Sequence, residues 1–237
     1  MPPRESCHGY RQAQDGGEEK PGHHSEASGL RGWTQLDWFG MTQIKLHMPN
    51  LSDRNVPIAK YLLPQLLVGG VEDDPFGLLL REFVRLVDKA VFEYEDARGA
   101  FETGSENHRY ILPHIAFTNH FETCINAVAR LLKILDRLVR LHRNAGQLRT
   151  IRKMAKAAEK EVRGIRDQIE HMAEDIQKGA RAAGDPIMLA LSEDGKTARV
   201  GDQCIALSEV ARAITALHRV ALAVLQSGSQ TTLPEAI

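Results

Sequence analysis

One short stretch of the chain combines residue types that can move a proton and hold a phosphate. It reads Arg166-Asp-Gln-Ile-Glu-His171. Cleavage of RNA through the ribose 2′-hydroxyl needs a group that transfers protons near neutral pH and a cation that stabilises the charge growing on the phosphate. We therefore predict His171 for proton transfer and Arg166 for phosphate binding. Asp167 lies four residues before His171 on a shared helix face, and we predict that it orients the imidazole.

The spacing of these residues sets a geometric condition. Five residues turn an α-helix through about 140°, so Arg166 and His171 do not point the same way. They would meet through the long arginine side chain, through a local distortion, or because a second subunit brings its own copy. If a second subunit brings the two groups together, the catalytic site requires a homodimer. We expect this protein to form one.

The stretch resembles the signature motif of the HEPN superfamily, in which an arginine is followed by a polar residue and, four to six residues beyond the arginine, by a histidine. Arg166, Asp167 and His171 match these positions. The resemblance covers roughly residues 75 to 225 and implies a bundle of four or five helices. It also implies a dimeric endoribonuclease that needs no metal or cofactor, often a toxin with an antitoxin partner or a phage-defence component. Other members keep the fold without activity.

Spacing alone does not single this motif out. The same separation of arginine and histidine occurs at Arg109/His114 and at Arg137/His142, but only Arg166 is followed by a carboxylate. The surrounding sequence therefore favours the third pair.

A non-catalytic interpretation of the motif also stays open. Arg166 and Glu170 are four residues apart and would form an exposed ion pair worth a few tenths of a kcal/mol, with His171 facing solvent. The chain would then be a non-catalytic helical module that binds nucleic acid or a partner protein. For His114 and His120, on the preceding predicted helix, two roles stay open. They either line the same cleft as the motif residues or are structural histidines.

Basic residues concentrate in one part of the chain. The 237 residues carry a formal net charge of −1, but twelve basic residues between Arg130 and Arg166 stand against three acidic ones. Such an excess suits a phosphate backbone, unless carboxylates of the same bundle shield it. The residues to which we assign a nucleic-acid contact are Arg149, Arg152, Lys153, Lys156 and Arg163.

The longest helical pattern carries the motif. It runs from Leu148 to Lys178 with Gly164 as its only interior glycine, and its apolar positions are alternately three and four residues apart. These positions are Ile151, Ala155, Ala158, Val162, Ile165, Ile169, Met172 and Ile176. Because this stripe must be buried against other helices, we predict a bundle with one long helix near its centre.

Other helices precede and follow this one. Asp74-Pro75 is a strong helix start, and the helix behind it should end by Gly104. A second helix is predicted from about Pro113 to Gly146, and a last one begins after a cap at Ser208.

A different pattern occupies residues 186–207, where short apolar runs are separated by turns at Asp194-Gly195 and Gly201-Asp202. This pattern predicts a small antiparallel β-meander. The predicted fold class is therefore all-α, an up-and-down bundle of four to five helices with this meander before the last helix.

The remaining segments complete the predicted organisation. Residues 1–40 are too polar to fold and are predicted to be disordered. Residues 41–72 form a proline-containing lead-in with a short helix around Ile58 to Leu67, residues 73–228 form the bundle, and residues 229–237 form a loose tail. Three cysteines without metal or redox spacing predict reduced thiols, and no apolar run reaches the length of a signal peptide or membrane span. We therefore expect a cytoplasmic protein with no membrane partner.

Overall fold

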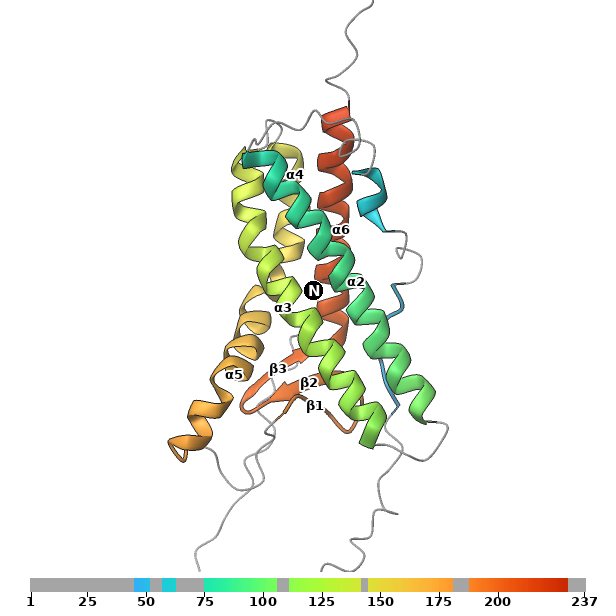
Figure 1. The fold of residues 1–237 in the computed structure, drawn as a ribbon, viewed down its shortest axis with the longest axis vertical. Coiled ribbons are helices and arrows are strands. Elements are labelled where there is room, and N and C mark those ends of the chain that lie inside the picture. The colour runs from blue at the N-terminus through green and yellow to red at the C-terminus, as the bar shows by residue number, and fades with distance from the viewer. Residues whose placement is uncertain are drawn as a thin grey trace, which may run out of the picture. The chain divides into compact units, whose positions relative to one another are not determined.

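Most of the described chain is helical, as the sequence predicts. The structure is a computed structural model that describes residues 45–51, 57–62, 75–105, 111–141, 145–180 and 188–229, all within one unit spanning residues 44–237. The elements are η3 (Ile58–Tyr61), α2 (Pro75–Ser105), α3 (Ile111–Leu141), α4 (Ala145–Ala155), η4 (Lys156–Ala158), α5 (Glu159–Gln177), β1 (Ala190–Leu191), β2 (Thr197–Val200), β3 (Gln203–Ala206) and α6 (Leu207–Ser229) (Figure 1). An all-α bundle with a small antiparallel meander before the last helix is confirmed. The predicted disordered segment, the Asp74 cap and residues 230–237 lie outside the described residues.

Helices α2 and α3 pack along one another and supply much of the core (Figure 1). The rings of Phe101 in α2 and Phe117 in α3 meet edge to face, with their centroids 5.9 Å apart. Farther along, the Cys124 thiol donates a hydrogen bond to the Ala90 carbonyl at 3.4 Å. Cys124 is a free, buried thiol, as predicted. Pro75 begins α2 as the sequence indicates, because its missing amide proton costs nothing in the first helical turn.

The long helix predicted from Leu148 to Lys178 is not continuous, which corrects the sequence interpretation. The 3₁₀ turn η4 separates α4 from α5, and Ala158 leaves the helical region with φ −98° and ψ 7°. Helix α4 packs mainly on α6, whereas α5 packs on α3 and on the sheet. Ala155 and Ala158 are both buried at this break, so small side chains permit the change of direction.

The apolar stripe along α4 and α5 is otherwise buried as predicted. Ala155, Ala158, Val162 and Ile165 are buried, and Ile151, Ile169 and Met172 pack partly against the core. Ile176, in the last turn of α5, is half exposed. In Figure 1 this end of α5 leads away from α3 and α6. The stripe therefore ends at solvent rather than against another element of the described chain.

The meander forms one antiparallel sheet in the order β1-β2-β3. Its turns hold Gly195 and Gly201 at φ 65° and 56°, a conformation that glycine adopts without strain. Helix α6 begins at Leu207, one residue before the predicted Ser208 cap. Cys204 in β3 is disulfide-bonded, which contradicts the expectation of a reduced thiol at this position.

Two side chains of α3 hold the start of the meander. Thr118 donates from Oγ1 to the Leu189 carbonyl at 3.0 Å, and the Glu122 carboxylate is hydrogen-bonded to the Leu189 backbone. Thr118 and Glu122 are four residues apart, so they share one face of the helix. Leu189 is fully buried between these contacts and the core.

The lead-in segment is fixed by two carboxylates of α2. Asp88, itself buried, accepts hydrogen bonds from the amides of Ile58 at 2.8 Å and Ala59 at 2.9 Å, which begin the 3₁₀ helix η3. Seven residues on, Glu95 accepts a hydrogen bond from the Leu51 amide at 2.5 Å. The predicted short helix is therefore confirmed for Ile58–Tyr61, and its remainder to Leu67 extends beyond the described residues.

Candidate nucleic-acid interface

The predicted catalytic residues lie on α5, where Arg166 and His171 are each next to a carboxylate. The Arg166 guanidinium donates from Nε and Nη2 to Oε1 of Glu170 at 2.8 and 2.5 Å. His171 Nδ1 lies 3.8 Å from Oε2 of Glu174, and both of these side chains are 60% exposed. Among the described residues the carboxylate beside His171 is thus Glu174, and Asp167 is exposed without a contact to it. The exposed ion pair between Arg166 and Glu170 is confirmed.

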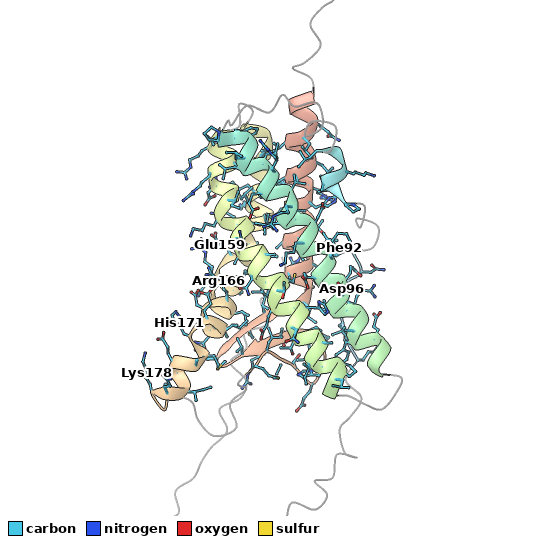
Figure 2. All side chains as sticks on the ribbon, in the orientation of Figure 1. Phe92, Asp96, Glu159, Arg166, His171 and Lys178 are labelled. Atoms are coloured by element: carbon cyan, nitrogen blue, oxygen red, sulfur yellow. The ribbon has the colours of Figure 1, made fainter. Side chains whose placement is uncertain are left out.

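Helical geometry places His171 and Arg166 on different sides of α5. His171 follows Lys160 by eleven residues, a turn of about 20°, so His171 and Lys160 share a face. Arg166 is about 140° from His171 and is only partly exposed, at 36% of its side chain. In Figure 2, Glu159, Arg166, His171 and Lys178 follow one another along the length of α5, from its first residue to just past its last turn. The structure leaves His171 open to solvent, and it does not join His171 to Arg166 within one chain.

A network of charges clamps the junction of α4 and α5 against α3. Asp136 of α3 accepts hydrogen bonds from Arg152 at 2.7 Å and from Lys156 at 2.7 Å. Lys156 also lies 3.2 Å from Glu159, which in turn binds Arg163 at 2.6 Å. Three of the five predicted nucleic-acid contacts, Arg152, Lys156 and Arg163, therefore have structural partners.

These contacts shift the ionisation of Asp136 and Lys156. Burial opposes the charge on Asp136, but the hydrogen bonds from Lys156 and Arg152 outweigh it and lower the pKa of Asp136. The hydrogen bond to Asp136 raises the pKa of Lys156, with Glu159 adding to the effect. The junction is therefore charged over the whole physiological pH range.

The remaining cations of this region face solvent on α3, α4 and α5. Arg149, Lys153 and Lys160 are exposed on α4 and α5. Lys133, Arg137 and Arg140 are exposed on α3, where spacings of four and three residues put them on one arc of the helix surface. Within the described ranges none of these six forms an ion pair, although Arg140 Nε donates to the Asp136 carbonyl at 3.0 Å.

We call the resulting surface the basic face. It consists of Lys133, Arg137 and Arg140 of α3 together with Arg149, Arg152, Lys153, Lys156, Lys160 and Arg163 of α4, η4 and α5. Among the described residues, these nine cations form ion pairs with two carboxylates, Asp136 and Glu159. Toward α2 it is bordered by Arg130, whose Nη2 lies 2.7 Å from Glu82. The carboxylates of the bundle therefore shield the basic region in part and leave it strongly positive.

The α3 cations were not assigned to a site from the sequence. The sequence does contain a pattern that could have identified them. Lys133, Arg137 and Arg140 repeat at helical spacing, with the apolar residues of α3 between them. Only the structure shows that this row lies beside the cations of α4, since Asp136 joins the two helices over 16 and 20 residues of sequence.

The histidines of α3 have structural surroundings. His114 stacks on Phe117, with their ring centroids 6.4 Å apart, and burial lowers the pKa of His114. His120 Nδ1 lies 2.9 Å from Oε2 of Glu93 on α2. These contacts favour the structural interpretation of both residues over a place in a cleft with His171.

The described residues bring together no group of three or more His, Cys, Asp or Glu side chains that could hold a metal ion. Among the same residues, no helix combines the length and apolar composition that a membrane span requires. Comparisons with family models, with curated proteins and with solved structures found no match to this chain.

Proposed function

We propose that this chain is a HEPN-like helical module that binds RNA through its basic face. The observation that carries the proposal is the side-by-side placement of exposed cations on α3 and on α4–α5, six of them without an ion pair in the described part of the chain. Lys and Arg that neutralise phosphates release counterions, and this electrostatic term dominates the affinity of proteins for nucleic acid. The resemblance of Arg166, Asp167 and His171 to the HEPN motif favours RNA over other polyanions.

The fold makes the basic face a fixed surface. Asp136 and Glu159 hold three of its cations in place. The six cations that form no ion pair with the described residues therefore stand on helices whose relative position is set. A preorganised array loses less conformational entropy on binding than the same charges on a flexible tail. Residues from three helical segments thus act as one interface.

Charge reversal tests the proposal. Lys133→Glu combined with Arg137→Glu removes two exposed cations that have no ion pair among the described residues and should leave the bundle folded. At about 100 mM salt we expect the affinity for RNA to fall at least tenfold or so, because each lost phosphate contact weakens binding. Fluorescence anisotropy with a labelled RNA measures the change.

A matched control separates position from net charge. Lys89→Glu combined with Arg219→Glu makes the same charge change at exposed positions of α2 and α6, outside the basic face. This control is expected to bind RNA within about threefold of the wild type, since a distant charge is screened beyond roughly 10 Å. Equal losses in both double variants would contradict the proposed interface.

Metal-independent RNA cleavage is the second candidate function. It is favoured by the exposure of His171 on the α5 face that also carries Lys160 of the basic face. Arg166 would stabilise the phosphate after exchanging Glu170 for it, either within one chain or across a homodimer. Under this candidate the protein is cytoplasmic, and an antitoxin protein would be its regulatory partner.

One assay decides between binding alone and cleavage. Purified protein is incubated with RNA in EDTA, with His171→Ala and Arg166→Ala beside the wild type. Cleavage by the wild type that is lost in both variants supports the nuclease. If the wild type is inactive, or if His171→Ala is as active as the wild type, the nuclease candidate is excluded and RNA binding through the basic face is unaffected.

A further inference from the structure

The basic face offers phosphate ligands but no aromatic ring. Phe121 is the last Phe, Trp or Tyr in the sequence, and every residue of the basic face follows it. Phe121 itself is buried in the core. Proteins that bind single-stranded RNA usually stack its bases on aromatic side chains. The basic face therefore lacks the groups that hold a single strand by its bases.

The cations form two rows on neighbouring helices. Along α3, Lys133 to Arg140 covers about 10 Å, and along α4 and α5, Arg149 to Lys160 covers about 16 Å at the rise of a helix. Packed helices have axes roughly 8–10 Å apart. The bonds from Asp136 to Arg152 and Lys156 keep the two rows beside each other.

We infer that the basic face binds an RNA duplex through its phosphates alone, with one row of cations for each strand. This inference rests on the proposed RNA binding and specifies its substrate. Duplex RNA is recognised mostly by shape and backbone contacts, and its narrow major groove brings the phosphates of the two strands opposite each other. A duplex also presents about twice the charge of a single strand along the same length.

Titrations with three nucleic acids test the inference. The probes are an RNA duplex of about 20 base pairs, each of its separated strands, and a DNA duplex of the same sequence, all at about 100 mM KCl. We expect the RNA duplex to bind about tenfold more tightly than either strand and several-fold more tightly than the DNA duplex, whose wider major groove sets its two rows of phosphates farther apart. If all six cations without an ion pair contact phosphates, log K should fall with log salt concentration with a slope of about −5.

Single substitutions test the two rows separately. Arg137→Gln in α3 and Arg149→Gln in α4 should each reduce the salt slope for the RNA duplex by about one, whereas Arg219→Gln in α6 should leave it unchanged. A slope that changes in only one of the first two variants would overturn the assignment of one row to each strand.

The outcomes distinguish this inference from the function on which it rests. Equal or tighter binding of a single strand overturns the inference and leaves RNA binding standing. A DNA duplex that binds as tightly as the RNA duplex overturns the match between the two rows of cations and the narrow major groove of RNA. If no probe binds, the proposed function itself is wrong.

Discussion

The Glu122 carboxylate of α3 is partly buried beside Leu189, the residue just before β1. Burial raises the pKa of Glu122, and the hydrogen bond from the Leu189 backbone only partly offsets this effect. A folded-state pKa above the unfolded value gives stability that is present below pH 4.5 or so and is lost as pH rises through the folded pKa. The charged form of Glu122 therefore weakens the fold at neutral pH.

Replacing Glu122 by Gln should stabilise the protein at neutral pH. The amide oxygen can still accept the Leu189 hydrogen bond, but the partly desolvated charge is gone. We expect the free energy of unfolding to rise by a few tenths of a kcal/mol at about pH 7 and to stay near that of the wild type below about pH 4. Urea unfolding at both pH values measures the difference, with exposed Glu193→Gln as control. A loss of stability at neutral pH would contradict this account.

The ion pairs of individual side chains show which contacts the sequence predicts and which it does not. The pair of Arg166 with Glu170 follows from a local spacing of four residues, so it could be predicted. The partner of Arg152 and Lys156 could not, because Asp136 lies on another helix and its position depends on how α3 and α4 pack.

Among the elements, α5 and β3 make an unusually close approach at Gly164. A Cβ added there would collide with the end of the Gln203 side chain in β3. Alanine is otherwise favoured over glycine inside a helix by about 1 kcal/mol. The cost of the collision and the gain in helix propensity therefore oppose each other.

A double-mutant cycle separates these two effects. Gly164→Ala alone is expected to be nearly neutral, because Gln203 must rotate away. In a Gln203→Ala background the same change should raise the free energy of unfolding by about 1 kcal/mol. Gly99→Ala in α2 is the control, since no other described part of the chain comes within 4 Å of its added Cβ beyond the local helix backbone, so the gain should appear directly. If Gly164→Ala has the same effect in both backgrounds, the contact between position 164 and the Gln203 side chain does not oppose the gain in helix propensity.

The start of the 3₁₀ helix η3 depends on one buried carboxylate of α2, Asp88. Asp88→Ala removes both acceptors of the Ile58 and Ala59 amides and should cost roughly 2–3 kcal/mol of stability. Hydrogen exchange at these two amides should accelerate, because they lose their partners. Asp96→Ala, an exposed position on the same helix, is the control and should change stability by less than about 0.5 kcal/mol. Unchanged exchange at Ile58 would contradict the capping role of Asp88.

Most elements could be predicted from apolar periodicity and turn residues, but the break at η4 could not. Ala155 to Ala158 keeps helix-forming residues and the apolar stripe without interruption. The break arises because α4 and α5 pack on different partners, which is a property of the assembled bundle. Tertiary packing overrides helix propensity here.

In the described unit as a whole, charge is segregated although the full chain is nearly neutral. The nine cations of the basic face repel one another more than Asp136 and Glu159 can offset, and this repulsion is a cost of the folded state. An anion that binds only the folded protein should relieve the repulsion and stabilise the fold. The excess of basic over acidic residues between Arg130 and Arg166 could be predicted from the sequence. The packing of α3 on α4 brings these basic residues together on one surface.

Thermal unfolding with the RNA duplex provides a test that needs no labelled ligand. At a duplex concentration about ten times Kd, binding to the folded state adds about 1.4 kcal/mol, which corresponds to a rise in Tm of roughly 3–6 °C for a chain of this size. The Lys133→Glu/Arg137→Glu variant should lose most of this rise while the Lys89→Glu/Arg219→Glu variant keeps it. Because reversed charges also reduce self-repulsion, the first variant should unfold at an equal or higher temperature than the wild type when no RNA is present. A lower Tm in the absence of RNA would mean that Lys133 or Arg137 stabilises the bundle rather than serving as a free phosphate ligand.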